Sequence, residues 1–134
     1  MTPLQVDVTD DSSVDEAAKT VEETYGCLDI LVNNAGIFSQ NPVAREAFRE
    51  VLAVNCVGAV SVTEAFLPLL RKSESPRLIF VSSSVGSISQ AADPESKYYR
   101  PTANEYRASM YHISLFLYRL TTPGACLMTL ALTP

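Results

Sequence analysis

Three short apolar runs stand out along the chain, and longer amphipathic stretches separate them. The runs are Leu4–Asp10, Leu28–Gly36 and Arg77–Ser87. Each has the length of a strand, and each ends in polar or turn-forming residues. Nearly continuous apolar strands are typical of a parallel sheet that is covered on both faces. The pattern therefore predicts three strands, the last two of them buried.

A helix is predicted between the first two runs. Apolar residues recur there at helical spacing and share one face: Val14, Ala17, Ala18, Val21 and Tyr25. Ser13 and Glu16 have the spacing of a capping box at the start of a helix, and Gly26 is typical of a helix end. We therefore expect the segment Asp11–Gly26 to be helical.

Longer helical patterns follow the second and third runs. One stripe of mostly apolar residues predicts a long helix that Pro68 and the polar segment after it close: Phe48, Val51, Leu52, Asn55, Ala59, Val62, Phe66 and Leu69. A polar loop, Gln90–Glu105, comes before a second predicted helix, Tyr106–Leu120. The tail, Thr121–Pro134, has no clear pattern.

Strands that alternate with helices predict βαβ units, a parallel sheet and an α/β fold. With 134 residues and no evident linker, we expect one domain over 1–134. Ligands of such sheets bind beyond the carboxyl ends of the strands. The polar residues at those predicted ends are Asp7, Asn33–Asn34 and Ser82–Ser84.

Composition narrows the classes of function. The formal charge of −5 comes without a basic cluster, which argues against nucleic acid and anionic membranes as partners. No uncharged apolar run reaches the length of a membrane span. Three widely spaced cysteines, Cys27, Cys56 and Cys126, form neither a disulfide framework nor a zinc pattern, and His112 cannot complete a metal site with them. We expect a cytoplasmic protein with reduced thiols and no metal site.

Several polar residues are more informative as a set than singly. The Asn33–Gly36 segment alone is only a turn, since Asn and Gly suit strained backbone. Asn55, however, interrupts the apolar stripe of the long helix, and a buried amide needs hydrogen-bond partners. Ser83 ends a strand and Tyr106 opens a helix. Each has a plain structural explanation when it is taken by itself.

Taken together and in order, these residues resemble the short-chain dehydrogenase/reductase family. The matching residues are Asp7–Val8, Asn33–Gly36, Asn55, Ser83 with its neighbours, and Tyr106. The resemblance covers roughly Leu4 to Ser109 and corresponds to the middle of a family member. It implies an incomplete Rossmann-like domain, with a doubly wound parallel sheet in three α/β/α layers.

The resemblance also implies a function, an NAD(P)-dependent oxidoreductase that moves a hydride to or from a small carbonyl or alcohol substrate. Tyr106 would be the general acid/base, Ser83 would bind the substrate oxygen, and Asn55 would organise the helix and a proton path. Ser82 is the next choice for the serine. The residues expected to contact the adenosine part of NADP or NAD are Asp7, Asn33, Asn34, Ala35 and Gly36. Pairing of copies through the long helix and the Tyr106 helix is implied too.

One departure from the family concerns the acid/base. The family has a Lys four residues after the Tyr, where this chain has Met110. A free phenol has a pKa of about 10, and a nearby cation lowers it. Positions i and i+4 share a helix face, so we do not expect Lys97 or Arg107 to replace the missing ammonium.

Further departures lie toward the two ends. No two of the five glycines are close enough for the family's phosphate-binding G-x-G turn, and the match fades after Ser109. We expect a truncated chain that starts at the family's third strand and is inactive or impaired. Alternatives are a non-catalytic remnant or partner-binding module, and an incomplete gene model of an active reductase. The long interval between Ser83 and Tyr106 suits either a substrate loop or an exposed loop without a role.

Overall fold

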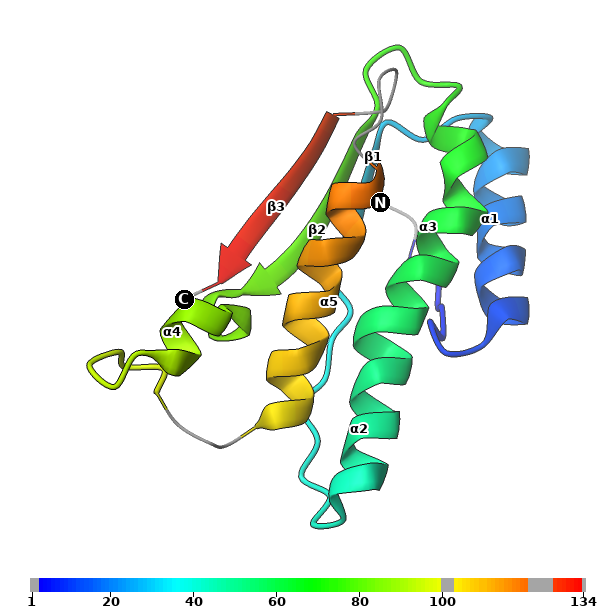
Figure 1. Ribbon diagram of the computed structural model, residues 1–134. Helices are drawn as coiled ribbons and strands as arrows, with labels where there is room; N and C mark the ends of the chain where they lie inside the picture. Colours follow the sequence, from blue (N-terminus) through cyan, green and yellow to red (C-terminus); the bar gives the residue numbers. More distant parts are fainter. Residues whose placement is uncertain (1–2, 100–102, 121–126, 134) are drawn as a thin grey trace.

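The computed structural model describes residues 3–99, 103–120 and 127–133. Helices and strands alternate along these residues (Figure 1). In chain order they are α1 (Asp11–Tyr25), β1 (Ile30–Asn33), α2 (Ala44–Leu52), the π-helical segment η1 (Ala53–Gly58), α3 (Ala59–Leu70), β2 (Arg77–Ser83), the short 3₁₀ turn η2 (Ser84–Gly86), α4 (Ile88–Ala92), α5 (Asn104–Leu120) and β3 (Leu127–Thr133).

The three strands form one parallel sheet in the order β1-β2-β3, which confirms the α/β class. β3 was not predicted, because the tail shows no clear pattern in the sequence. In the structure it pairs with β2 along its whole length, from Arg77 opposite Leu127 to Ser83 opposite Thr133. Strand formation there depends on the hydrogen-bonding edge that β2 offers, which is a contact distant in sequence.

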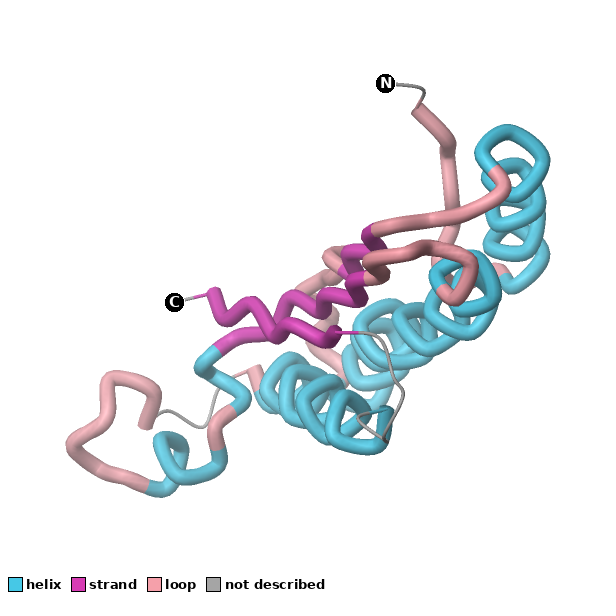
Figure 2. The backbone as a smooth tube through the Cα atoms, turned by 90° about the horizontal axis from the view of Figure 1, so that it is seen from above, coloured by secondary structure: helices cyan, strands magenta, loops and turns pink. Residues whose placement is uncertain are grey.

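The helices lie on one face of the sheet (Figure 2). Successive right-handed crossovers that move in one direction along a sheet place their helices on the same side. The second helical layer of the three-layer expectation, and the reversal of strand order in a doubly wound sheet, are not among the described elements. The prediction that β1 is buried is therefore wrong for the face of the strand turned away from the helices. Ile30 and Val32 on that face are 40% and 50% exposed.

Helix α1 confirms the predicted helix but not its predicted cap. Asp10 is the N-cap, and its side chain accepts from the backbone N–H of Ser12 at 3.0 Å. Ser13 lies inside the helix, and its hydroxyl accepts from the N–H of Asp7. The capping box is wrong because the N-cap is Asp10, three residues before Ser13. Gly26 ends the helix with φ of +76°, a conformation that glycine adopts without strain.

The first predicted strand is also wrong. Leu4–Asp10 forms no strand, and its residues are mostly exposed. A strand needs a neighbour that completes its hydrogen-bond ladder, and among residues 3–99, 103–120 and 127–133 none pairs with this segment. Val8 nevertheless packs closely on the long helix, since a Cβ added to Gly58 would lie 2.9 Å from the Val8 carbonyl oxygen.

The predicted long helix is continuous over Ala44–Leu70 and comprises α2, η1 and α3. Pro68 lies inside its last turn instead of ending it. Length and composition alone would let these 27 residues cross a membrane, but core helices of soluble proteins meet the same test. Here the helix supplies core residues, including Val51, Phe66 and Leu70.

Two apolar clusters hold the layers together. The first joins the end of α3, β2 and α5, and consists of Leu70, Leu78, Phe80, Met110 and Ile113. The second joins α1 to α3 through Ala17, Ala18, Phe66 and Leu69. Met110 is thus a core residue, 4% exposed, which bears directly on the chemistry expected of Tyr106.

Candidate active site

The candidate site lies where β1 and β2 end. Figure 1 shows α4 and the first turn of α5 at the end of the sheet to which the arrow of β2 points. The loop after β1, the η2 turn after β2 and the start of α5 all meet there. The carboxyl edge of a parallel sheet is where its ligands normally bind.

Asn55 connects two of these parts. It is fully buried in η1, and its Oδ1 accepts from the N–H of Ile37 at 2.8 Å. Its Nδ2 donates to the Ile37 carbonyl and to the Ser109 hydroxyl, both at 3.0 Å. Ser109 in turn donates to the carbonyl of Tyr106 at 2.8 Å. The expectation that a buried amide there has partners is confirmed. The chain from Asn55 through Ser109 to Tyr106 was not found from the sequence, where Ser109 carried no signal.

The segment Asn33–Gly36 divides into two parts. Asn33 donates from Nδ2 to the hydroxyl of Thr63 at 3.0 Å, and Thr63 is buried on α3. The Asn33 side chain therefore fixes β1 to the helical layer. Asn34, Ala35 and Gly36 are exposed at the end of the strand. Of the four residues of this segment, which with Asp7 are expected to contact an adenosine, these three are accessible.

Asp7 is exposed in the segment before α1. Its Oδ1 accepts from the Thr9 hydroxyl at 2.7 Å and from the Thr9 N–H at 2.9 Å. The hydrogen bond from the Thr9 hydroxyl, followed by that from its backbone, lowers the pKa of the Asp7 carboxyl. Asp7 is therefore a carboxylate at neutral pH, able to accept from a sugar or base.

The three consecutive serines have different surroundings. Ser82 is 1% exposed and donates to the Met110 carbonyl at 3.2 Å, so its hydroxyl lies in the core. Ser83 is the last residue of β2, and its hydroxyl accepts from the N–H of Val85 at 3.4 Å. Ser84 donates to the phenol oxygen of Tyr98 at 2.9 Å. Ser83 is itself 7% exposed, and its role as the serine that binds a substrate oxygen stays a prediction.

Tyr106 lies in the first turn of α5, beside the loop after β1. Its half-buried ring packs edge-on against Phe38, with the ring centroids 6.1 Å apart. Within the part of the chain that the structure describes, the Tyr106 hydroxyl has no hydrogen-bond partner. Met110, one turn on, is buried in the apolar cluster of β2 and α5. Position 110, where the family has its Lys, therefore offers no ammonium to this phenol.

The two other cations considered from the sequence bind elsewhere. Lys97 places its ammonium 4.8 Å from the ring centroid of Tyr98. Arg107 donates from Nη2 to the Tyr98 carbonyl at 2.6 Å and from Nη1 to the Val85 carbonyl at 3.3 Å. Arg107 thus holds the loop before α5, while Lys97 lies against the ring of its neighbour. In the sequence, the aromatic pair Tyr98 and Tyr99 is only a weak sign of this grouping.

Gly86 lets the η2 turn approach α5. A Cβ at Gly86 would lie 2.8 Å from the Met110 Cβ and 3.0 Å from the N–H nitrogen of Tyr111. We predict that Gly86→Ala lowers the free energy of unfolding by about 1–3 kcal/mol, because the backbone of α5 cannot give way. Urea denaturation measures the change. Gly36→Ala is the control, since its Cβ would meet Asn55 Oδ1 at an ordinary 3.6 Å. Equal effects of the two substitutions would contradict the close approach.

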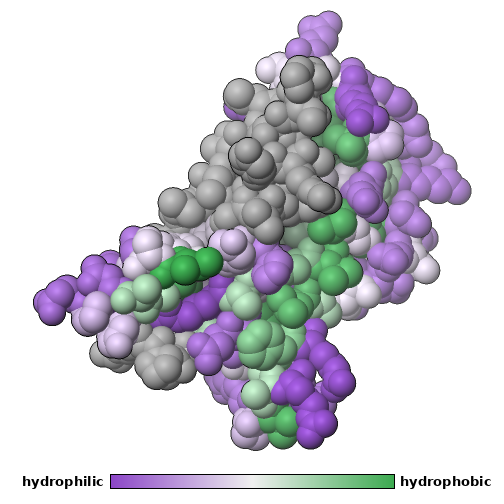
Figure 3. Space-filling view, in the orientation of Figure 1, coloured by the Kyte–Doolittle hydropathy of each residue, from purple (hydrophilic) through white to green (hydrophobic). Residues whose placement is uncertain are grey.

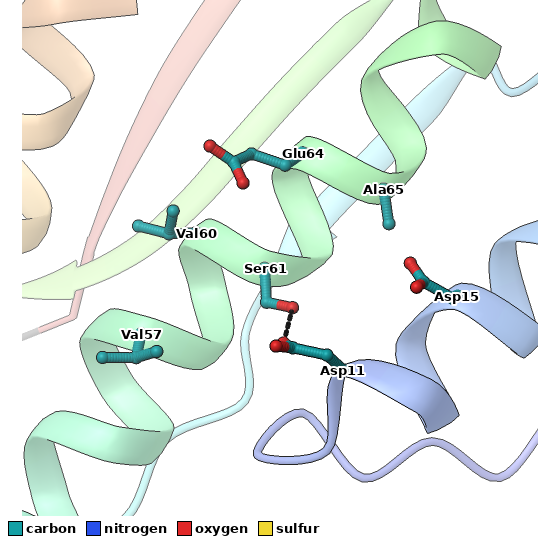
Figure 4. A pocket seen from close by; sticks show the side chains of 7 residues that line it. All are labelled: Asp11, Asp15, Val57, Val60, Ser61, Glu64 and Ala65. Atoms are coloured by element: carbon teal, nitrogen blue, oxygen red, sulfur yellow. Dashed lines mark hydrogen bonds between the residues drawn. The ribbon is translucent and has the colours of Figure 1, made fainter.

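A separate shallow cleft of about 360 Å³ lies between α1 and the long helix (Figure 4). Three acidic side chains line it, Asp11, Asp15 and Glu64, together with apolar residues of η1 and α3. Asp11 accepts from the Ser61 hydroxyl at 2.6 Å. Carboxylates repel phosphate groups, so this cleft does not suit the diphosphate of a dinucleotide.

Comparison with known proteins decides the family. A family model described as short chain dehydrogenase matches residues 1–97. The chain belongs to the short-chain dehydrogenase family. The short-chain dehydrogenase anuI of Penicillium roqueforti is 44% identical over 103 residues, which cover 73% of this chain and 41% of that protein. This short-chain dehydrogenase chain therefore spans about two fifths of the length of that curated relative.

Solved structures of short-chain dehydrogenases share the fold. A short-chain dehydrogenase/reductase from Burkholderia phymatum, in complex with NAD, matches with a TM-score of 0.76 and 21% identity, over 95% of this chain and 45% of that one. A gluconate 5-dehydrogenase from Burkholderia cenocepacia, in complex with NADP and tartrate, matches with a TM-score of 0.66 and 25% identity, over 82% and 40%. These neighbours bind NAD in one case and NADP in the other.

The described residues fit one part of such a cofactor. Asn34, Ala35 and Gly36 are exposed beside the end of β1, and the Asp7 carboxylate is accessible, so hydrogen-bonding groups suited to an adenosine are present. Among residues 3–99, 103–120 and 127–133 there is no glycine-rich turn for a diphosphate. The described residues of this short-chain dehydrogenase chain therefore suit the adenosine part of the cofactor.

Proposed function

We propose that the chain belongs to an NAD(P)-dependent oxidoreductase that acts on a small carbonyl or alcohol substrate. The observation that carries the proposal is the hydrogen-bonded connection through Asn55. It joins the loop after Asn33–Gly36 to the helix of Tyr106, while Ser83 ends the neighbouring strand. The resemblance assigns these parts to a hydride-transfer site, and the connection through Asn55 supports that assignment.

The roles follow the resemblance residue by residue. Ser83 donates to the substrate oxygen, Tyr106 exchanges a proton with it, and Asn55 fixes the helix that carries Tyr106. Asp7 and the exposed residues 34–36 contact the adenosine. A bound nicotinamide cofactor supplies or accepts the hydride, and the protein positions the substrate and moves one proton. We propose that residues 1–134 act as one cytoplasmic domain, with NAD or NADP as cofactor.

In this proposal, proton exchange by Tyr106 is slower than in family members that have the Lys. General acid/base catalysis contributes roughly 10²–10⁴-fold when the group titrates near the operating pH. In the family, a Lys beside the phenol favours its ionised form by Coulomb attraction. The buried Met110 offers no charge and no donor to Tyr106. We therefore propose a chain that is impaired relative to family members with the Lys.

A second candidate is a non-catalytic module that binds a partner. The observation in its favour is exposed apolar surface. Ile30 and Val32 lie on the open face of the sheet, and Val57 on the long helix is 64% exposed. Figure 3 shows apolar surface gathered over the middle of the helical face. Contiguous apolar surface of this kind marks association sites or a tendency to aggregate.

Titration of the purified protein with NADH and NADPH, followed by cofactor fluorescence, separates the two candidates. The oxidoreductase proposal expects saturable binding that Asp7→Asn weakens about tenfold, since a charge-assisted hydrogen bond contributes roughly 1.5–3 kcal/mol. The control is Glu23→Gln, an exposed carboxylate of α1 that lies 3.9 Å from the Lys19 ammonium. A flat titration with both cofactors, together with concentration-dependent association in sedimentation, would favour the partner-binding module.

A further inference from the structure

The loop after β1 carries an exposed aromatic ring beside the proposed acid/base. Phe38 in this loop packs edge-on against Tyr106, with the ring centroids 6.1 Å apart and the ring planes at 61°. Phe38 is nevertheless 57% exposed, so much of its ring is open to a solute. Ligand sites are lined mainly by apolar and aromatic side chains, with few polar groups among them. Phe38 therefore lies where a molecule bound beside Tyr106 would contact it.

The backbone is held on both sides of Phe38. Before it, the Ile37 N–H donates to Asn55 Oδ1 at 2.8 Å, and the Ile37 carbonyl accepts from Asn55 Nδ2 at 3.0 Å. After it, the Ser39 hydroxyl donates to Glu50 Oε2 at 2.6 Å. Asn55 and Glu50 both belong to the long helix, so the position of Phe38 is fixed relative to that helix.

Glu50 anchors the second side of the loop through two residues. Its Oε1 accepts from Asn41 Nδ2 at 2.9 Å, and the Asn41 N–H donates to the Ser39 hydroxyl at 3.1 Å. The hydrogen bond from Ser39, followed by that from Asn41, lowers the pKa of the Glu50 carboxyl, which is therefore ionised at neutral pH. A ring that is already held in place loses little freedom when a ligand binds, and such preorganisation raises affinity.

Phe38 is not a core residue. Within the part of the chain that the structure describes, it belongs to neither apolar cluster, whereas Tyr106 packs against the cluster of β2 and α5. Substitutions at exposed positions of this kind usually change stability little. The ring of Phe38 can therefore be altered while the fold is kept, which makes its role in binding testable.

We propose that Phe38 selects the substrate of this site and favours a small ketone or alcohol with a flat aromatic group next to the reacting carbon. The aromatic group stacks on the Phe38 ring, and the substrate oxygen faces Tyr106. Aromatic rings gain more from such contact than their buried area alone provides. Glu50 is a positioning residue that acts through Ser39 and Asn41. The inference rests on the proposed oxidoreductase function, in which Tyr106 exchanges the proton and the nicotinamide carries the hydride.

The first test needs neither cofactor nor turnover. Acetophenone and cyclohexyl methyl ketone, which differ in having a flat or a puckered ring, are each added to the purified protein with ring-labelled phenylalanine. Phe38→Leu assigns the Phe38 signal in the NMR spectrum. We expect acetophenone to shift this signal saturably, with a Kd roughly 2–10-fold lower than that of the cyclohexyl ketone. Equal affinities, or a Phe38 signal that neither ketone shifts, would overturn the inference.

The second test is reduction of the same two ketones with NADPH. We expect Phe38→Leu to raise KM for acetophenone roughly 2–10-fold with little change in kcat, because stacking stabilises the bound substrate and the transition state alike. The KM for the cyclohexyl ketone should change much less. The control is Val43→Ala, which truncates another exposed apolar side chain of the same loop. Equal increases of KM for both ketones, or the same change in Val43→Ala, would speak against selection by Phe38.

Glu50→Ala tests the positioning role. The matched control is Glu46→Ala, which removes an exposed carboxylate of α2 that pairs with Arg49 at 2.7 Å. Only Glu50→Ala should raise KM for acetophenone more than KM for the cyclohexyl ketone, and an unchanged ratio would contradict the role of Glu50. If the wild-type protein shows neither cofactor binding nor turnover, the oxidoreductase function fails. The NMR titration alone then decides whether Phe38 binds an aromatic group.

Discussion

Replacing Met110 by Lys should lower the free energy of unfolding by roughly 3–5 kcal/mol, the cost of leaving a buried charge without a partner. Although this substitution restores the family's residue, the side chain at this position is 4% exposed and packs with Leu70, Leu78 and Phe80. The contacts of Gly86 with the Met110 backbone leave little room for α5 to turn. An ammonium placed there would meet apolar groups on most sides.

Urea denaturation at neutral pH measures this effect, and Met110→Leu is the matched control. A volume-conserving apolar exchange should cost less than about 1.5 kcal/mol. We also expect no gain in ketone reduction from Met110→Lys. A stable Met110→Lys protein with a large gain in turnover would show that the side chain can reach Tyr106, contrary to the packing described here.

Asn55→Ala should lower the free energy of unfolding by about 3 kcal/mol and release the loop after β1. The substitution removes all three hydrogen bonds of a fully buried amide, two to the backbone of Ile37 and one to Ser109. Each buried polar group left without a partner costs about 1–3 kcal/mol. The Ile37 groups regain part of this from water, because Ile37 is 39% exposed.

The matched control is Asn34→Ala, which truncates an exposed amide in the same loop. Substitutions at such surface positions usually change stability by no more than about 0.5 kcal/mol. Hydrogen exchange at the Ile37 N–H gives a local readout and should accelerate in Asn55→Ala only. If both variants lose similar stability, the bridge from Asn55 to Ile37 is not what fixes this loop.

The helices could be predicted because their apolar spacing is a local property of the sequence. Helix α1, the long helix and α5 lie where the periodicity places them. Asn55 could be singled out for the same reason, since one polar residue in an apolar stripe needs an explanation. The role of Asn55 in a proton path, and those of Ser83 and Tyr106 in catalysis, remain predictions.

What the sequence did not reveal depends on distant partners. β3 forms against the edge of β2, whereas Leu4–Asp10, which looks more like a strand, has no ladder partner in the described ranges. The N-cap of α1 is Asp10 and not the predicted Ser13, because the Asp10 carboxylate accepts from the N–H of Ser12 in the first turn. The contact between Ser84 and Tyr98 joins a strand end to a loop, and no periodicity predicts such a meeting.

The π-helical segment η1 also determines the directions in which the side chains of α2 and α3 point relative to each other. Asn55 on η1 accepts a hydrogen bond from Ile37, and Thr63 on α3 accepts one from Asn33. The long helix thus holds β1 and the loop after it through two residues that are eight positions apart. In a regular α-helix each residue advances the side-chain direction by about 100°, and a π-turn absorbs one extra residue. Deleting one residue between Asn55 and Thr63 would therefore turn one half of the helix by about a quarter circle against the other. The loop after β1 and the strand itself could then no longer be held at the same time.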